Sequence, residues 1–301
     1  MITAKVSLSA ILRAHGQWLE NPAAGSPANL AGMTLNEADL AGAVLRRASM
    51  TRVTLLDANL ADADLSGARL SGADLQRASL TGADLEGADI GSVDFGGAWM
   101  EGANLSEASG ADVCFRRARM AKARLADVSL QQPDFRNATL PGAAFQQARL
   151  YEPNFDECDL AETQFHHARL HHARMTGVGA YAANFSGAKL DHCDFSGSDL
   201  SSARFSRAEL IQCTFESARL QQCDFRETRM RGGDFSYAVL EGARFQGAQL
   251  TMANFRGANL KGAREMTPEQ LLQALTDQTT ILPNGSYGPY LRYSGAEKPK
   301  A

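Results

Sequence analysis

The chain has 301 residues, of which 44% are hydrophobic, 7% aromatic and 21% charged, a composition that supplies a packed core and excludes a disordered polypeptide. Thirty Lys and Arg residues against 34 Asp and Glu residues give a formal charge of −4, so no basic excess favours direct binding of nucleic acid or of an anionic membrane. No apolar run is long enough to span a bilayer, and we therefore expect a cytoplasmic protein.

Residues 1–27 predict a capping helix followed by a lead-in. Apolar residues recur there at helical spacing, and the pattern stops at Asn21-Pro22, where proline cannot continue a helix. The apolar positions are Leu8, Ile11, Leu12, Trp18 and Leu19. Such a helix must bury its apolar face, so we expect it to cover the N-terminal end of the element that follows.

From residue 28 to residue 264 the sequence repeats every five residues. Of the 47 positions taken in fives from Leu30 to Leu260, 45 carry Leu, Ile, Met or Phe, and all 14 Phe of the protein are among them. A small residue, most often Ala, stands two places before nearly every large one. A period of five fits neither a helix nor a strand. It fits a chain that turns a corner once per pentad, points the small and large residues inward, and stacks coil upon coil.

The positions of Phe predict how many sides each coil has. From Phe145 to Leu260 the large residues alternate between Phe and Leu, apart from Met175, Ala180 and Met230. Three-sided coils would mix Phe and Leu in one column, whereas four-sided coils of 20 residues keep the columns separate. We therefore predict an all-β solenoid of square cross-section, with about 12 coils in roughly 56 Å.

Two pentads show the repeat in its fullest form, Ala83-Asp84-Leu85-Glu86-Gly87 and Ala258-Asn259-Leu260-Lys261-Gly262. They resemble the signature of the pentapeptide-repeat family: a small residue, Asp or Asn, Leu or Phe, and two polar residues. The resemblance covers about three quarters of the chain. It implies a right-handed quadrilateral β-helix, which agrees with the alternation of Phe and Leu.

Two pentads lack the large residue, at Gly110 and Ala180. The missing side chain would leave a void unless the coil tightens or a neighbour fills the space. We expect locally repacked coils at both places. A bend or a partner site is the alternative.

Residues 265–276 predict a second capping helix, at the C-terminal end. Thr267-Pro268-Glu269-Gln270 has the form of a capping box with proline at the first helical position, and Leu271, Leu272 and Leu275 follow it. Both ends of a stacked rod expose unpaired strand edges, so a helix here would close the second end.

Residues 277–301 predict a tail, part of which we expect to be disordered. It contains a Pro283-Asn284-Gly285 turn, three tyrosines and a polar end. The leucines of the second cap together with Tyr287, Tyr290 and Tyr293 exceed what one small cap can bury. This end of the chain therefore favours a homodimer formed through the C-terminal helix and tail.

Five cysteines without CxxC spacing argue against a disulfide framework. Cys158, Cys193, Cys213 and Cys223 occupy the small inward position, so we expect buried thiols that fill the place of alanine. Cys193 and Cys213 lie one coil apart, within reach of a disulfide by Cα spacing. A cytoplasmic setting favours reduced thiols.

The segment from residue 166 to residue 172 is rich in outward-facing histidine. His166, His167, His171 and His172 lie in it, and His192 follows His172 one coil later. Two imidazoles at strand spacing could share Zn²⁺, but the pattern supplies no third or fourth ligand. We expect a solvated histidine ladder and predict no metal site.

A row of basic residues also recurs every 20 positions. Arg149, Arg169 and Lys189 form the row, and Glu209 interrupts it before Arg229. A phosphate or an acidic partner could lie along this row. The alternative, which we favour, is that acidic residues on neighbouring corners neutralise it: Asp159, Glu162, Asp191 and Asp194.

The sequence contains no GxSxG, HExxH, P-loop or dinucleotide-binding motif, and no insertion that could form a pocket. We therefore predict a non-enzymatic protein without cofactors or catalytic residues, which acts as a scaffold or adaptor for another protein. The family resemblance implies an alternative, a DNA mimic that binds DNA gyrase or topoisomerase IV and protects it from poisons. A bacterial secretion-linked or effector role is a third possibility.

Charge decides how well the DNA-mimic alternative fits, because a mimic of duplex DNA should be strongly acidic. Residues 28–130 hold 14 acidic and 10 basic side chains, and residues 131–264 hold 15 of each. Only the N-terminal half is acidic overall. We therefore favour the scaffold.

Overall fold

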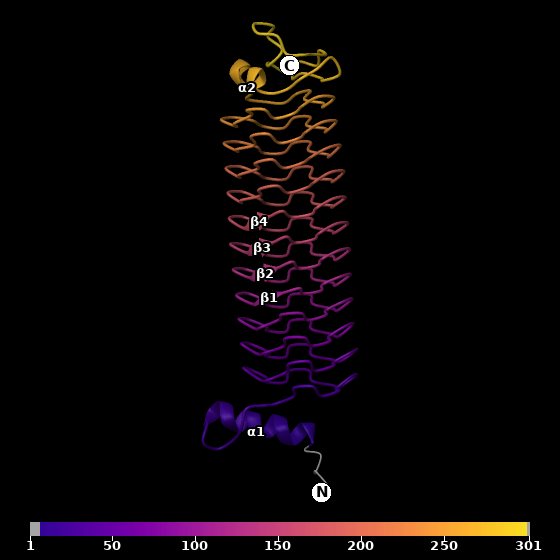
Figure 1. Cartoon of the computed structure of the whole chain (residues 1–301), viewed down its shortest axis with the longest axis vertical. Coiled ribbons are helices and arrows are strands. Elements are labelled where there is room, and N and C mark those ends of the chain that lie inside the picture. The colour runs from indigo at the N-terminus through magenta and orange to yellow at the C-terminus, as the bar shows by residue number, and fades with distance from the viewer. Residues whose placement is uncertain (1–6, 300–301) are drawn as a thin grey trace.

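Residues 20 positions apart lie side by side in the computed structural model, which describes residues 7–299. Parallel backbone pairing joins Asn29 to Ser49 and Ser49 to Arg69, and pairs with the same separation follow on every side as far as Arg244 with Arg264. Each coil therefore has four sides of one pentad each, as the Phe alternation predicted. The coils stack into a straight rod with a helix at each end (Figure 1).

One side of the rod contains the named strands. They form a four-stranded parallel sheet in chain order, and each is displaced by 20 residues from the last. Most other sides form single bridges, because each pentad uses about three residues for the side and two for the corner. The strands are β1 (Ser109–Ala111), β2 (Ser129–Gln131), β3 (Arg149–Tyr151) and β4 (Arg169–His171).

The corners have a regular conformation that turns side chains outward. The second residue after each large one is left-handed, with φ of 63° at Gly87, 59° at Glu107 and 58° at Arg117. The next N–H closes the turn, as where Ala88 donates to the carbonyl of Leu85 at 3.0 Å. Many corners carry charged residues in place of glycine, although this conformation disfavours them. The corners therefore present charged groups at fixed positions along the rod.

The core consists of the repeated large and small side chains. Phenyl rings stack within a column, as Phe195 and Phe215 do at a centroid distance of 4.9 Å with an interplanar angle of 2°. Rings of the opposite column meet them edge-on, as Phe205 meets Phe195 at 6.1 Å and 88°. The two Phe columns predicted from the sequence therefore face each other across the core. Leu35, in the first coil, is only partly buried.

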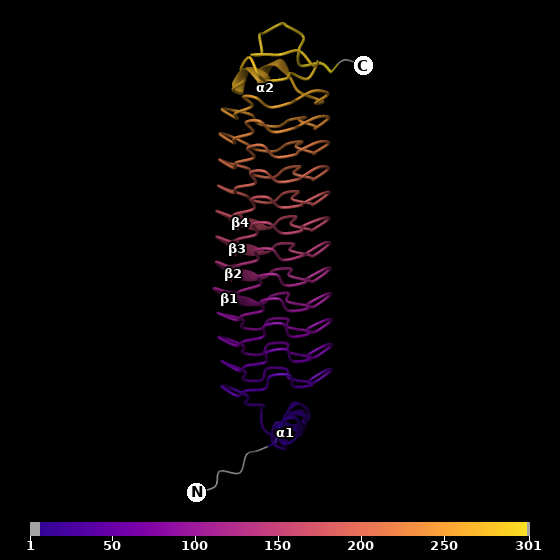
Figure 2. The same ribbon diagram turned by 90° about the vertical axis from the view of Figure 1, so that its right-hand side faces the viewer.

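The predicted N-terminal helix is α1 (Leu8–Glu20), which lies across the first coil (Figures 1 and 2). Ser7 caps it by accepting the N–H of Ala10. Leu8, Ile11 and Leu12 pack against the core. The helix therefore covers part of the open end of the rod, as expected.

The residue at the centre of this packing is His15, which the sequence pattern marks only as a break in an apolar run. His15 is fully buried, its Nδ1 accepts the N–H of Ala28 at 3.0 Å, and its ring stacks on Trp18 at 5.6 Å. The imidazole therefore joins α1 to the start of the first coil.

Protonation of His15 should loosen α1. Burial lowers the pKa of His15 below its ordinary value of 6.5, so the unfolded state takes up the proton first and the histidine contributes stability above about pH 6.5 that is lost as the pH falls. We expect Trp18 fluorescence, measured in a Trp99→Phe background, to change reversibly between about pH 7 and pH 5. The change should be absent in His15→Gln, and a pH-independent signal in the parent protein would contradict this role.

The C-terminal end is closed by α2 (Pro268–Gln273) and the tail. Thr267 and Gln270 form the predicted capping box, and the Gln270 side-chain amide donates to the carbonyls of Phe245 and Ala248, both at 2.8 Å. The chain after α2 then continues the ladder, because Leu275 pairs with Asn254, and Ile281 of the tail pairs with Asn259. This end is therefore covered by backbone pairing as well as by a helix.

The division of the chain at residues 27, 264 and 276 stays a prediction. Residues 277–299 are described as turns that pack on the last coil, with Leu282 and Tyr290 buried. Residues 1–6 of the expected lead segment, and residues 300–301 of the polar end, lie outside the described residues.

Candidate protein-interaction surface

The basic row lies on the side of the rod that contains β1 to β4. Arg149 on β3 and Arg169 on β4 are register partners, and Lys189 follows. Glu209 lies 3.8 Å from Lys189 and 3.4 Å from Arg229, so this part of the row is neutralised. Arg149 and Arg169 form no ion pair with any residue between 7 and 299. The basic row is therefore neutralised only at Lys189 and Arg229, and the residue that neutralises them is Glu209.

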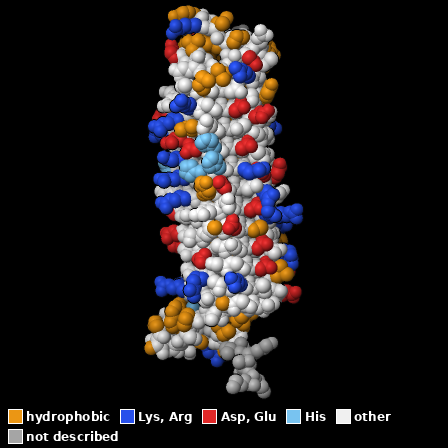
Figure 3. Space-filling model, in the orientation of Figure 1, with side chains coloured by type: hydrophobic (Ala, Val, Ile, Leu, Met, Phe, Trp, Pro, Cys, Tyr) orange, Lys and Arg blue, Asp and Glu red, His pale blue; other side chains and the backbone are white. Residues whose placement is uncertain are grey.

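His166 and His167 lie on one corner, His171 and His172 lie on the next, and His192 lies one coil beyond His172. Figure 3 shows histidine side chains gathered on one face of the rod, beside Lys and Arg side chains. The rings of His172 and His192 stack at 5.0 Å, and His171 lies 3.6 Å from Asp191. Burial lowers the pKa of His166. Within the described part of the chain, no three His, Cys, Asp or Glu side chains gather as a metal ion would need.

The four inward cysteines are buried and free, as predicted. Each thiol donates to a carbonyl 23 residues earlier, as Cys158 does to Phe135 at 2.8 Å and Cys223 to Leu200 at 3.0 Å. Thr163 makes the same bond with its hydroxyl, to Leu140 at 2.9 Å. Burial raises the pKa of Cys158 to about 12, so this thiol stays protonated and structural at neutral pH.

The pentad at Gly110 has no room for a side chain. A Cβ at Gly110 would lie only 2.7 Å from the backbone nitrogen of Gly91 on the preceding coil, so only glycine fits there. At the second exception, Ala180 is fully buried. At Gly110 the backbone of the neighbouring coil therefore lies where a side chain would start.

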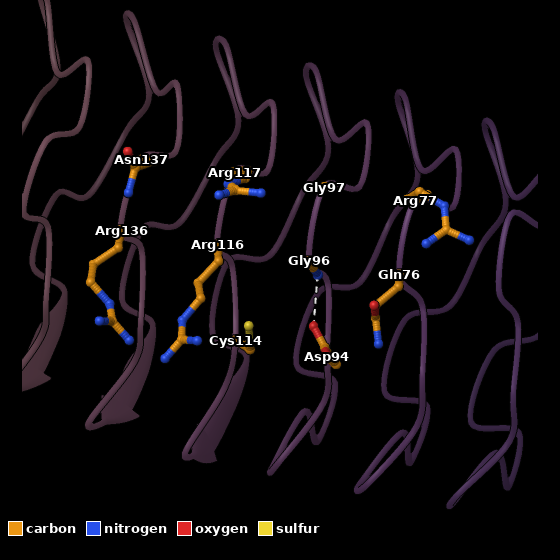
Figure 4. Close-up of a pocket in the computed structure, with 10 residues that line it drawn as sticks. All are labelled: Gln76, Arg77, Asp94, Gly96, Gly97, Cys114, Arg116, Arg117, Arg136 and Asn137. Carbon is orange, nitrogen blue, oxygen red and sulfur yellow. Dashed lines mark hydrogen bonds between the residues drawn. The ribbon is translucent and has the colours of Figure 1, made fainter.

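A groove of about 650 Å³ opens on another side of the rod. Its floor is Gly96-Gly97, two consecutive corner positions without side chains, and its walls come from the coils before and after (Figure 4). We call this groove the glycine notch. Its other lining residues are Gln76, Arg77, Asp94, Cys114, Arg116, Arg117, Arg136 and Asn137.

Guanidinium groups dominate the glycine notch. Arg116 and Arg136 both pair with the carboxylate of Asp134, Arg136 at 2.8 Å. Burial alone would raise the pKa of Asp134, but hydrogen bonds from Arg136 and Arg116 hold it below its usual value. Arg77 pairs with Asp57 at 2.8 Å. Arg117 makes no ion pair with a described residue, so its charge faces solvent.

An aromatic side chain lies two residues beyond the notch. Trp99 is 45% exposed, and the guanidinium carbon of Arg119 lies 3.9 Å from the centroid of its ring. Cation–π contact of this kind holds both groups in place. Trp99 is thus a half-exposed indole on the next side of the same coil, two residues after Gly97 and outside the lining of the notch.

Charge is sorted along the rod around this point. Residues 57–112 carry 11 Asp and Glu against two Arg, whereas residues 116–136 carry six Lys and Arg against two Asp. We call the first segment the acidic belt and the second the basic belt. Counts over residues 28–130 merge the two belts, and neither belt is visible in the charge totals of the two halves. The glycine notch lies where they meet.

The family model for pentapeptide repeats matches in eight copies, over residues 28–60, 58–97, 91–127, 118–155, 208–247 and 223–262. A second model, for a pentapeptide repeat region, matches residues 148–218. The chain belongs to the pentapeptide-repeat family. The rod is therefore a right-handed quadrilateral β-helix, as the sequence predicted.

Several solved pentapeptide-repeat structures are similar to this chain. HetL, a protein involved in heterocyst differentiation regulation in the cyanobacterium Nostoc sp. strain PCC 7120, is 26% identical over 91% of this chain and 98% of its own, with a TM-score of 0.30. A protein of the Arabidopsis thaliana thylakoid lumen is 32% identical over 32% of this chain and 62% of its own, with a TM-score of 0.27.

QnrB1, a plasmid-mediated fluoroquinolone resistance protein, is 21% identical over 65% of this chain and 82% of its own, with a TM-score of 0.23. Curated protein sequences give no match. Among residues 7–299 of this pentapeptide-repeat protein, no helix has the length and apolarity to cross a bilayer.

Proposed function

We propose that this pentapeptide-repeat protein is a non-enzymatic scaffold that binds another protein along the side of its rod, in the cytoplasm of a bacterial cell. The observation that supports this function is the sorting of charge into an acidic belt and a basic belt. Such a pattern selects a partner of complementary charge and speeds their encounter.

The rigidity of the rod supports the same function. The backbone of each corner is held at a fixed position, because every coil is paired to its neighbours through backbone hydrogen bonds. A preformed surface loses little conformational freedom when a partner binds. The rod can therefore present a long array of contacts without rearrangement.

The test is capture with the full chain as bait in extract of its source cells, followed by reconstitution with the purified partner. We expect a stoichiometric complex by light scattering, weakened at least tenfold when ionic strength rises from about 0.1 M to about 1 M. The proposal fails if no captured protein re-forms a complex with the purified chain.

The same light-scattering measurement tests self-association. We propose that two copies meet through α2 and the tail, where Leu272, Tyr287 and Tyr293 are 45%, 72% and 90% exposed. Leu271 and Tyr290 are buried within the chain, so they belong to the cap and are not accessible to a second copy. A mass of one chain at high concentration would contradict the homodimer.

A second candidate function is DNA mimicry, favoured by the acidic belt. The belt spans fewer than three coils, about 13 Å at strand spacing, and carries a formal charge of −9. Duplex DNA carries about eight charges over that length. The belt thus has the charge density of a duplex, as a protein that occupies the DNA site of gyrase or topoisomerase IV would need.

DNA mimicry is tested by gyrase supercoiling, with and without a quinolone. If the candidate is right, the protein inhibits or protects gyrase at low micromolar concentration, and Asp84→Asn with Glu86→Gln and Asp89→Asn abolishes the effect. If about 100 µM protein has no effect on gyrase supercoiling, DNA mimicry is rejected and the scaffold function remains. A matched control neutralises three carboxylates outside the belt: Glu157→Gln, Glu162→Gln and Glu216→Gln.

A further inference from the structure

We propose that the glycine notch binds the carboxylate side chains of an acidic segment in a partner protein, and that Trp99 receives an apolar side chain of the same segment. This inference rests on the proposed scaffold function and names the site and the class of ligand. It assigns a role to residues that the sequence pattern leaves as ordinary corners.

The shape of the notch comes from two missing side chains. Gly96 and Gly97 occupy both outward corner positions of one pentad, while the same positions one coil later carry Arg116 and Arg117. The resulting space of about 650 Å³ falls within the range of protein ligand sites, roughly 300–1,000 Å³. A side chain of a partner can therefore enter between two coils.

The charge of the notch selects an anion. Four arginines line it, Arg77, Arg116, Arg117 and Arg136, whereas Asp94 is the one carboxylate among the lining residues. Asp57 pairs with Arg77, and Asp134 pairs with Arg116 and Arg136, which leaves Arg117 as the lining arginine without an ion pair to a described residue. In Figure 4 the side chains of Arg116 and Arg136 extend in the same direction, one coil apart. Guanidinium groups bind carboxylates through two parallel hydrogen bonds. Arg117, free of any described partner, is the group best placed to do so.

The neighbouring indole favours a protein segment over a free anion. Trp99 is 45% exposed and stacked with Arg119, and Trp and Arg are the residue types that dominate protein interfaces. Inorganic phosphate gains nothing from an indole, whereas a peptide can place an apolar side chain against it. The acidic belt would repel the same segment, which keeps it on the basic side of the notch.

The experiment uses fluorescence anisotropy of a labelled eight-residue peptide of alternating glutamate and leucine, titrated with the full chain. We expect Arg117→Glu to weaken binding at least tenfold. Arg169→Glu is the matched control, because Arg169 is also exposed and unpaired among the described residues but lies on the β4 side. It should change affinity by less than about twofold.

A second pair of variants tests shape without charge. Gly97→Asn fills the notch with a residue that tolerates the left-handed corner. It should weaken binding of the peptide at least fivefold. Gly87→Asn is its control, because Gly87 has the same conformation and nothing within 4 Å of its added Cβ. Both variants keep the corner, so equal circular dichroism spectra establish that the rod is intact.

Three outcomes overturn the inference: equal weakening by Arg117→Glu and Arg169→Glu, unchanged binding by Gly97→Asn, or displacement of the peptide by submillimolar inorganic phosphate. The first would mean general charge attraction, and the last a phosphate site. If the peptide experiment fails but the captured partner still forms a stoichiometric complex, the notch is rejected as the binding site and the scaffold function stands. Failure of that complex would reject the scaffold itself.

Discussion

Replacing Phe205 by alanine should destabilise the rod by about 3 to 5 kcal/mol in urea or guanidinium denaturation. Its ring stacks on Phe185 and Phe225 at centroid distances of 4.9 and 5.2 Å. It also meets Phe195 and Phe215 of the opposite column edge-on, at 6.1 and 5.9 Å. Because backbone pairing fixes the distance between coils, the surrounding structure cannot collapse into the space that alanine leaves.

The matched control is Phe205→Leu. The same column carries leucine in its earlier coils, at Leu65, Leu85 and Leu105, so leucine fits this inward position and should cost only about 1 to 1.5 kcal/mol. A Phe205→Ala variant within about 1 kcal/mol of the parent protein would mean that the stacked rings contribute little beyond filling the column.

The core and its four-sided form could be predicted from sequence because the same constraint recurs in every pentad. A single pentad does not specify a fold, but 45 large residues in 47 places all point inward when the chain turns a corner once per pentad. The alternation of Phe and Leu then distinguishes four sides from three, because stacked columns select residues of similar shape. The C-terminal capping helix could also be predicted, because Thr267 to Gln270 form the capping box that starts it.

The ion pairs could not be predicted by comparing residues 20 apart. Some do follow a column, as Arg77 and Asp57 do. Others run diagonally between residues 18 apart, as in Arg46 with Asp64 and Arg174 with Asp156. Long side chains reach the next column as easily as the next coil. Whether Arg149 or Arg117 is neutralised therefore depends on side-chain geometry, which the repeat does not specify.

The glycine notch and His15 were missed for different reasons. Gly96-Gly97 looks like an ordinary pair of corner residues, and only the arginines one coil away on either side give it chemical character. The signal was available as a double glycine between Arg77 and Arg116-Arg117 at 20-residue spacing. His15 appears polar in a helical pattern, and nothing in the sequence tells that the N–H of Ala28 needs an acceptor there.

Replacing Gly25 by alanine should release α1 from the rod. An added Cβ would lie 2.1 Å from the carbonyl oxygen of Ala14 and 2.5 Å from the nitrogen of Trp18. Both are backbone atoms of α1, so no side-chain rotation can relieve the clash. We expect amide exchange in α1, measured by mass spectrometry, to become at least tenfold faster, because the helix loses the tertiary contacts that protect it.

Gly16→Ala is the control for this variant, because Gly16 lies within α1 and an added Cβ there meets nothing within 4 Å. Alanine should slow exchange in α1, since it favours a helix interior over glycine by about 0.5 to 1 kcal/mol. The release of α1 in Gly25→Ala would uncover Leu35 and the unpaired edge of the first coil, so aggregation should rise with protein concentration. Parental exchange rates in Gly25→Ala would show instead that α1 reaches the first coil by another path, and that the close approach at Gly25 is not what holds the N-terminal end closed.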